Sequence, residues 1–238
     1  MAQSAPGTKF TADYAQIVND ELGDDANNLL ASALKLRKVD EAVRHYSHYF
    51  PDQETVDVTG AGTYDYDLPT DWVIGFSSIV SVEFPKGDQT PTILKLGRVR
   101  IYYNSAVDVS KWRIRFLDTT PTANDTIRIT FTKPHKVTTT TSTIPDTHWE
   151  AVAALATGLC LYTMAGRSLS QRDSQVSGDL FRFRSVARDY QDLAETIVRE
   201  KYAKKLGISM DGAGFATEIV DLDMNLTGGI SPFGRPGV

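Results

Sequence analysis

The sequence is poor in cysteine, with Cys160 as the single example among its 238 residues. One cysteine cannot form a disulfide within the chain, which fits assembly of the protein in a reducing cytoplasm. Cys160 lies in the apolar stretch 155–161, whereas a nucleophilic thiolate needs a polar, electropositive setting. The pattern therefore predicts a buried core residue.

Long apolar runs and an excess of positive charge are also missing. No segment approaches the roughly 18 consecutive apolar residues that span a bilayer, so we expect no membrane partner. Residues 1–7 lack a basic segment followed by an apolar one and are not expected to be a signal peptide. The formal net charge of −5 gives no overall attraction to DNA, although it would suit a conduit through which DNA passes without adhering.

Motifs for catalysis, metal binding or cofactor binding are absent as well. There is no nucleophile elbow, Walker motif or zinc-binding cysteine set. His45 and His48 have a spacing that can bind a metal, but no further ligand completes the site, which favours surface or interface histidines. Asp65, Asp67 and Asp71 could suggest a cation site, but they lack the glycine and the terminal glutamate of a calcium loop. We therefore expect no enzyme activity, no metal and no cofactor.

The periodicity of the chain predicts an α+β fold. Apolar residues recur at helical spacing in residues 11–22 and again up to Tyr49, and Pro51 ends the second run. Residues 54–135 contain short runs that alternate between apolar and polar side chains, which favours an antiparallel sheet or small sandwich. A polar threonine linker at 138–143 then leads to helices near 148–166 and 174–205. The first of these is apolar nearly all round, which predicts a central place in a helical bundle.

Local signals also predict helix ends and buried faces. Thr11 is expected to cap the first helix, and Asp146 or Thr147 the third, with Glu150 completing a capping box. The last helix carries an apolar stripe that we expect to be buried. It comprises Val176, Leu180, Phe183, Ala187, Tyr190, Leu193, Ala194 and Ile197.

These patterns predict a division of the chain into an N-terminal arm, a helical bundle, an inserted domain and a C-terminal arm. Residues 1–10 are expected to be flexible. Residues 11–51 and 146–206 form the helical bundle, and residues 52–137 form the inserted β domain. Residues 207–238 form an extended arm.

The C-terminal arm is rich in glycine and proline, yet it keeps apolar residues for which a solvated linker has little use. We interpret it as a segment that folds on a partner. Its candidate contact residues are Phe215, Ile219, Val220, Leu222, Met224, Leu226, Ile230 and Phe233.

A second candidate contact surface is basic. Arg172, Arg182, Arg184 and Arg188 enrich the last long helix and the residues before it. They form either a face that contacts DNA or a neighbouring ring, or a solvated face paired with nearby aspartates. The sequence leaves both interpretations open.

Several core-type motifs resemble the head–tail adaptor (connector) proteins of tailed bacteriophages. They are Tyr46-Ser47 with Pro51, Leu68-Pro69 with Trp72, Val82-Glu83-Phe84-Pro85, Phe116-Leu117, Thr130-Phe131-Thr132, Pro134-His135 and Glu150-Ala151-Val152-Ala153. The resemblance covers about residues 10–205. It implies a helical bundle with a β insertion that forms a homo-oligomeric ring, usually a dodecamer, and a C-terminal arm that binds the portal protein.

The same resemblance implies a structural protein of the virion neck that assembles in the host cytoplasm. It would lie beneath the portal, extend the channel that double-stranded DNA traverses, and dock the downstream tail or nozzle protein. One alternative is another ring component of the neck or tail, such as a tail terminator or a nozzle-proximal protein. Another is a carbohydrate-binding module that uses exposed aromatic residues, namely Tyr64, Tyr66, Trp72, Tyr102 and Tyr103.

Overall fold

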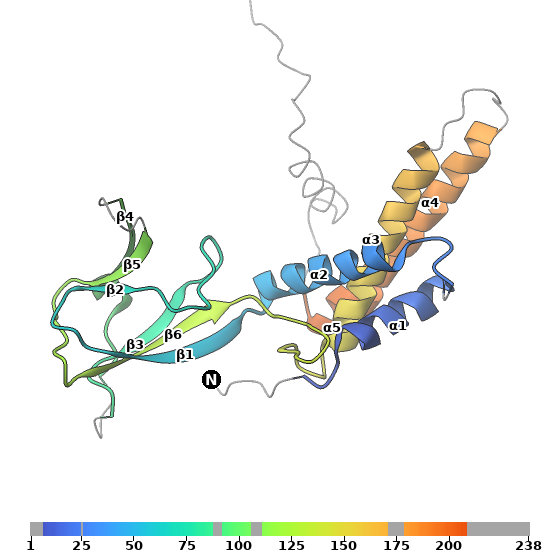
Figure 1. The fold of residues 1–238 in the computed structure, drawn as a ribbon. Coiled ribbons are helices and arrows are strands. Elements are labelled where there is room, and N and C mark those ends of the chain that lie inside the picture. The colour runs from blue at the N-terminus through green and yellow to red at the C-terminus, as the bar shows by residue number, and fades with distance from the viewer. Residues whose placement is uncertain (1–6, 25, 88–91, 106–110, 171–178, 209–238) are drawn as a thin grey trace, which may run out of the picture. The chain divides into compact units, whose positions relative to one another are not determined.

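The computed structural model describes residues 7–24, 26–87, 92–105, 111–170 and 179–208; for 111, 168–170 and 179–184 it describes the backbone alone. Contacts divide the described chain into two units (Figure 1). A helical unit contains residues 7–42 and the described residues from 138 to 208, and a β unit contains the described residues from 43 to 137. The predicted α+β class is confirmed.

The helical unit is arranged around α3 (Trp149–Ser170). Every residue from 151 to 161 is buried, as expected for a helix that is apolar nearly all round. It packs against α1 (Thr11–Leu22), α4 (Asp179–Ile197) and the π-helical turn Val198–Ala203 that continues α4. A last short helix, α5 (Lys204–Leu206), ends at Gly207, and α2 (Ser32–Tyr49) runs across the division between the two units.

A close helix approach depends on Gly158 of α3. A Cβ atom at this position would lie 2.5 Å from Cγ2 of Val198, which opens the π-helical turn. Carbon atoms in contact are normally about 3.5–4.0 Å apart. The missing side chain therefore lets α3 and the turn approach each other.

Two of the predicted helix caps are wrong. Thr11 is the first helical residue, and the backbone N–H of the preceding Phe10 donates to Oδ2 of Asp13 at 2.8 Å. Asp146 accepts hydrogen bonds from the backbone N–H and the hydroxyl of Thr8, at 2.8 and 2.9 Å. Its carboxylate thus holds the N-terminal segment in place of capping α3.

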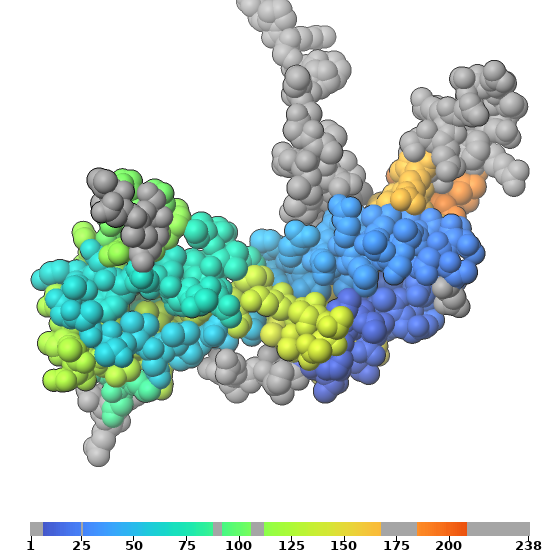
Figure 2. Space-filling model, in the orientation of Figure 1, coloured from blue at the N-terminus to red at the C-terminus, as the bar shows by residue number. Residues whose placement is uncertain are grey.

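The described end of the predicted N-terminal arm is part of the helical unit. The N–H of Gly7 donates to the carbonyl of Ser142, and the N–H of Thr11 donates to the carbonyl of Thr138, both at 3.1 Å. Figure 2 shows residues 138–147, in yellow-green, against the blue residues that open α1. The threonine segment, predicted as a linker, is therefore a hydrogen-bonded turn that covers the start of α1.

The apolar stripe predicted on the last helix is correct only in part. Ala187, Ala194 and Ile197 are buried, and Tyr190 is half-buried. Leu193, however, is 47% exposed, because the helix turns the neighbouring Ala194 toward its packing partner. The side chains of Val176, Leu180 and Phe183 lie outside the described residues.

The β unit contains two three-stranded antiparallel sheets in the described part of the chain, as the alternating pattern predicts. One has the order β1-β6-β3, and the other the order β2-β5-β4. The strands are β1 (Asp52–Thr59), β2 (Asp65–Asp67), β3 (Ile79–Glu83), β4 (Val99–Asn104), β5 (Lys111–Phe116) and β6 (Thr126–Lys133).

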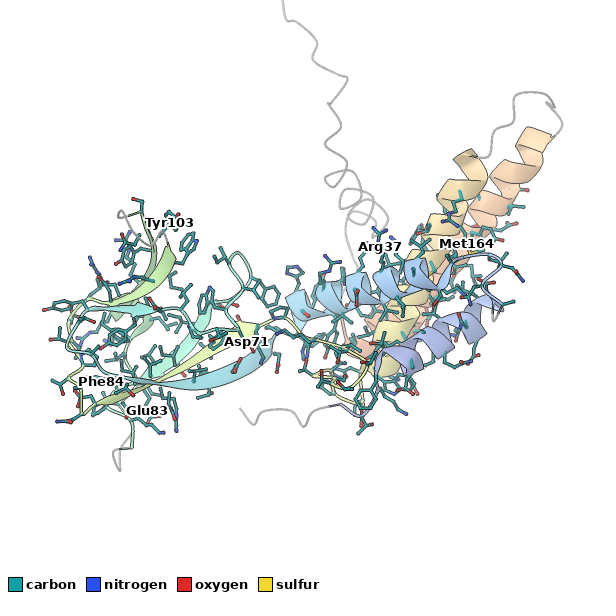
Figure 3. The ribbon with its side chains drawn as sticks, in the orientation of Figure 1. Arg37, Asp71, Glu83, Phe84, Tyr103 and Met164 are labelled. Atoms are coloured by element: carbon teal, nitrogen blue, oxygen red, sulfur yellow. The ribbon has the colours of Figure 1, made fainter. Side chains whose placement is uncertain are left out.

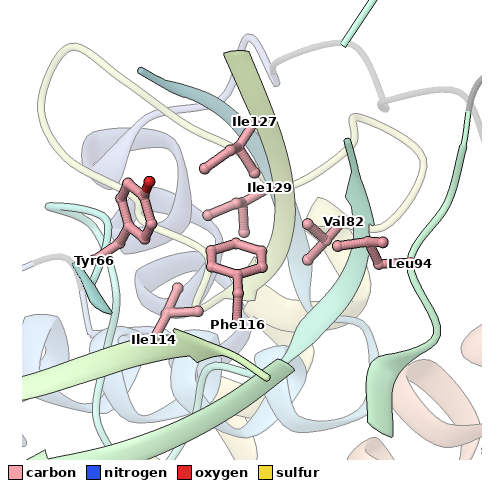
Figure 4. Close-up of a cluster of buried hydrophobic side chains, with 7 residues drawn as sticks. All are labelled: Tyr66, Val82, Leu94, Ile114, Phe116, Ile127 and Ile129. Atoms are coloured by element: carbon pink, nitrogen blue, oxygen red, sulfur yellow. The ribbon is translucent and has the colours of Figure 1, made fainter. Parts of the chain in front are cut away.

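The inner faces of the two sheets share one apolar core (Figure 4). Its buried members are Tyr66, Val82, Leu94, Ile114, Phe116, Ile127 and Ile129. The ring of Phe116 meets that of Tyr66 edge-on, with centroids 5.4 Å apart. The alternation noted in the sequence thus points apolar residues of β5 and β6 inward and arginines outward.

The hydroxyl of Tyr66 fixes two loops at the edge of this core. It accepts the N–H of Ala61 at 3.0 Å and donates to the carbonyl of Pro121 at 3.2 Å. Gly60 lies so close to the second loop that a Cβ atom would be 2.0 Å from the carbonyl oxygen of Thr122. The turn at residues 60–62 is therefore built around a backbone contact.

Candidate interaction surfaces

Most contact residues predicted from the sequence lie outside the described residues. All eight candidate contact residues of the C-terminal arm fall in 209–238, and Arg172 falls in 171–178. Arg182 and Arg184 lie on α4, where side chains are described only from Ser185 onward. Arg188 is exposed on α4. Both interpretations of these arginines stay open.

The two histidines with metal-binding spacing make aromatic contacts. The ring of His45 is 5.3 Å from that of Tyr49, and the ring of His48 is 5.3 Å from that of Phe76. Within the described ranges, no group of three or more His, Cys, Asp or Glu residues is placed to hold a metal ion. The expected absence of a metal stays a prediction.

A buried junction ties the end of α2 to the chain that leaves β6. The N–H of His135 donates to Oγ of Ser47 at 2.9 Å, and the Ser47 hydroxyl donates to the carbonyl of Val43 at 2.7 Å. Nε2 of His135 lies 2.8 Å from the carbonyl oxygen of Phe50, and its ring packs against Tyr46 at 5.1 Å. Sequence reasoning noted these residues only as motifs and missed their contact, since they lie far apart along the chain.

The three aspartates considered as a cation site are bound by cations of the protein. Asp65 accepts two hydrogen bonds of 2.7 Å from Arg115, and these bonds, against the opposing effect of burial, hold the pKa of its carboxyl below the usual range. Asp67 lies 3.7 Å from Arg113. Asp71 lies 3.5 Å from Lys133 on another part of the unit. These ion pairs favour a structural role for the three aspartates over a cation site.

The outer face of the first sheet carries a balanced ladder of charges. Asp57 of β1 pairs with Lys86 at 2.5 Å and with Arg128 of β6 at 3.0 Å. Hydrogen bonds from these two cations lower the pKa of Asp57. Arg128 also lies 3.6 Å from Glu83 of β3. This face is therefore largely neutralised by its own residues.

The outer face of the second sheet has a surplus cation. Arg100 of β4 is exposed and stands directly opposite Arg115 of β5, which is already paired with Asp65. The guanidinium of Arg115 lies 5.0 Å over the ring of Tyr102. Burial of the hydroxyl and, to a smaller extent, its hydrogen bond with Asp65 raise the pKa of Tyr102. In the described part of the chain Arg100 has no acidic partner, and it is the charge on this face that a partner could neutralise.

The aromatic residues considered for sugar binding differ in their exposure. Tyr66 is buried, and Trp72 packs on Phe131 with ring centroids 5.5 Å apart. Tyr64 and Tyr103 are about half exposed, at 52% and 51%. Tyr103, labelled in Figure 3, packs against a tryptophan of β5 at 5.6 Å.

A short apolar loop between β2 and β3 is held with its tip toward solvent. Val73 and Ile74 are exposed, the latter at 59%. The loop is closed by a hydrogen bond of 2.8 Å from the N–H of Ser77 to the carbonyl of Val73. The sequence signal, an apolar run at 72–74 followed by glycine, was available but was not interpreted as a surface feature.

The helical unit contains a cleft of about 460 Å³ between α1, α3 and the segment that follows α4. Two ion pairs cross it, Lys201 with Glu21 and Lys205 with Glu150, both at 2.5 Å. Charges of both signs line the cleft, so it does not present one sign to a ligand. The pairs instead hold the end of the described chain against α1 and α3.

Cys160 is fully buried in α3, as predicted. Burial raises the pKa of its thiol to about 12. The thiolate required of a nucleophile is therefore strongly disfavoured at neutral pH.

Comparisons with known proteins do not assign the chain to a family. No family model matches it, and no curated protein matches it. Among solved structures it is similar to a chain of "Neck of native GTA particle computed with C12 symmetry", with 16% identity and a TM-score of 0.26. The match covers 80% of this chain and 95% of that chain. Among the described residues, no helix has both the length and the apolar character needed to cross a membrane.

Proposed function

We propose that the chain is a non-enzymatic ring subunit of a virion neck, acting as a head–tail adaptor. It binds beneath the portal protein, extends the channel for double-stranded DNA, and docks the downstream tail or nozzle protein. The observation that carries the proposal is the division of the chain. Residues before and after the β segment belong to one helical unit, so that the β unit is an insertion, as the resemblance to connector proteins implies.

The two halves of the helical unit close a single core. Tyr14 of α1 packs edge-on against Trp149 of α3, with ring centroids 6.0 Å apart. The ammonium group of Lys9 lies over the ring of the same Trp149, 5.0 Å from the ring centroid. An apolar helix stripe needs a cover, and here residues more than 130 positions away along the chain supply it. Such a unit tolerates a large insertion between its halves.

The described surfaces support a role in protein contacts. The first sheet presents an internally neutralised face, and the loop at Val73 and Ile74 presents apolar side chains. The titratable groups of this sheet are paired with one another, which favours a structural role for them over a catalytic one. In this proposal the arm carries the portal contact, with Phe215 and Phe233 as its anchors, because buried aromatic residues often dominate interface energies.

The proposal is tested by mixing the purified chain with portal rings and measuring co-sedimentation and particle images by electron microscopy. A chain that ends at Ile208 should keep the thermal transition of the folded core and lose portal binding. The double variant Phe215→Ala, Phe233→Ala should weaken binding, whereas the control Tyr64→Ala, an exposed aromatic residue of the β unit, should not. Wild-type affinity in the shortened chain would refute the role of the arm.

The same experiment separates the alternatives. A chain that binds a tail tube or nozzle and not the portal would be another ring component of the neck or tail. A chain that stays monomeric with all of these partners would refute the ring subunit itself.

A further inference from the structure

Each sheet of the β unit ends in two edge strands, and these four edges differ in what they offer. An edge strand presents unpaired N–H and C=O groups to which another strand can add. β1 and β3 flank β6, and β2 and β4 flank β5.

Three of the four edges are poor acceptors for a further strand, above all for one that carries acidic side chains. β1 places Asp57 on its outer face, where it is already paired, and β2 is three residues long with an aspartate at each end. One end of β3 is covered, because Leu94 donates its N–H to the carbonyl of Val82 at 2.8 Å and Ile93 bridges Glu83.

β4 is the remaining edge and has two distinct faces. On the core side, Val99 and Ile101 are only partly buried and Tyr103 is half exposed, so further apolar side chains could cover them. On the outer side stands Arg100, the surplus cation of the sheet. Among the described residues β4 pairs with β5 alone. This edge fits a strand that is apolar on one face and acidic on the other.

The chain contains such a strand sequence in its C-terminal arm. Val220, Leu222, Met224 and Leu226 alternate with Asp221, Asp223, Asn225 and Thr227. A strict period of two over eight residues is typical of a strand with one apolar face. Glycine and proline are absent from this stretch, although they are frequent elsewhere in the arm.

We propose that residues 220–227 of one copy add as a strand to the β4 edge of a neighbouring copy. Their apolar side chains then cover Val99, Ile101 and Tyr103, and Asp221 or Asp223 faces Arg100. The inference rests on the proposed ring assembly, and it deepens it by naming the contact between subunits. A strand given to the next copy is a head-to-tail contact, and repetition of such a contact closes a ring. Phe215 and Phe233, which flank the strand, stay available for the portal.

Disulfide trapping tests the pairing and its source. One full-length chain carries Tyr103→Cys and a second carries a cysteine in the arm, both with Cys160→Ala, so that a cross-link between them can form only between copies. Because Tyr103 faces the core side, one of Leu222→Cys and Met224→Cys, according to the register, should yield covalent dimers, and Asp221→Cys and Asp223→Cys should not. Equal cross-linking at all four positions, or none in assembled rings, would overturn the proposal.

The source of the strand is tested separately. In a chain that carries Tyr103→Cys together with whichever of Leu222→Cys and Met224→Cys cross-links, we expect a ladder of linked copies. A monomer of altered mobility in place of the ladder would mean that the arm folds onto its own β4, and this too would overturn the proposal.

Charge reversal tests the register of the acidic face. Arg100→Glu should raise the protein concentration needed for ring assembly several-fold, and Asp221→Lys with Asp223→Lys should restore it. Arg98→Glu is the matched control, since Arg98 is exposed beside β4 and already paired with Asp118 at 3.2 Å. An equal effect of both single reversals would argue against strand addition at Arg100. Portal binding is measured in parallel: if it persists without cross-links, the strand addition fails and the adaptor role stands, whereas cross-links without portal binding refute the adaptor role alone.

Discussion

The contact between Gly158 and Val198 gives a prediction whose sign depends on the partner residue. In Gly158→Ala, the new Cβ atom would lie 2.5 Å from Cγ2 of Val198, which is 1% exposed and cannot move into solvent. Forcing a methyl group into a packed core typically costs about 1–3 kcal/mol. Replacing glycine by alanine inside a helix returns about 0.8–1.0 kcal/mol. We therefore expect a net loss in the free energy of unfolding of up to about 2 kcal/mol.

Removal of the obstructing methyl groups should reverse this sign. Val198→Ala alone lowers the stability, because a buried branched side chain is lost. In that background the next atom near the new Cβ is the carbonyl oxygen of Ala194 at 3.6 Å, an ordinary contact. Gly158→Ala should then stabilise by up to about 1 kcal/mol, close to its helix propensity. The double variant should therefore be more stable than the sum of the two single effects on the free energy of unfolding predicts.

The measurement is urea unfolding followed by circular dichroism for the two single variants and the double variant. Gly166→Ala is a matched control on the same helix, since nothing lies within 4 Å of its Cβ position, and it should stabilise by roughly 0.8–1.0 kcal/mol. Additive effects of Gly158→Ala and Val198→Ala, or a stabilising Gly158→Ala in the wild-type background, would refute the close contact.

Three further predictions concern buried polar groups. Burial opposes the charge of Asp24, but hydrogen bonds from the N–H groups of Leu29 and Leu30 and from Lys35 outweigh it and hold the pKa of its carboxyl well below the usual range. The stability that this carboxylate contributes is thus complete above the unfolded pKa and is lost as the pH falls below about 4, so the difference between wild type and Asp24→Asn in unfolding experiments should shrink there. Cys160, with a thiol pKa raised to about 12, should resist a thiol reagent at pH 8 until denaturant is added, and rapid labelling of the native protein would contradict its burial. Tyr66→Phe should lower the free energy of unfolding by about 1–2 kcal/mol in calorimetry, because the N–H of Ala61 and the carbonyl of Pro121 lose a shared partner; an unchanged transition would argue against this link.

The order of elements could be predicted from the sequence because each signal is local. Period-two alternation fixed the inward residues of β5 and β6, and the dense apolar pattern of 151–161 predicted a buried helix. The residues that cap the helices were harder to predict from the sequence. Asp146 has the right residue type for a cap, but Thr8, which lies 138 positions away, offers it two donors. Competition from distant partners is not visible in a local pattern.

Surface features were the least predictable part. The exposure of Leu193 depends on which face of α4 meets α3, and the small Ala194 decides this by allowing the closer approach. The junction of Ser47 and His135 joins residues 88 positions apart. The uncovered edge of β4 follows from strand order, which alternation alone cannot give.

The distribution of charge leads to a last prediction, on salt. Residues 209–238 contain four acidic residues and one arginine, so most of the net charge of −5 resides in the arm. The acidity that seemed suited to a DNA conduit therefore belongs mainly to the arm, which contains the strand proposed to meet Arg100. Attraction between exposed charges weakens as salt shortens the screening length from about 10 Å at 0.1 M to about 3 Å at 1 M. Ring assembly, followed by light scattering, should accordingly need more protein at 0.5 M than at 0.05 M salt, and Asp221→Asn with Asp223→Asn should remove most of that dependence. Asp211→Asn, an acidic residue of the arm outside the proposed strand, is the control. A salt dependence that survives the double substitution would mean that the acidic face of the strand does not meet a cation.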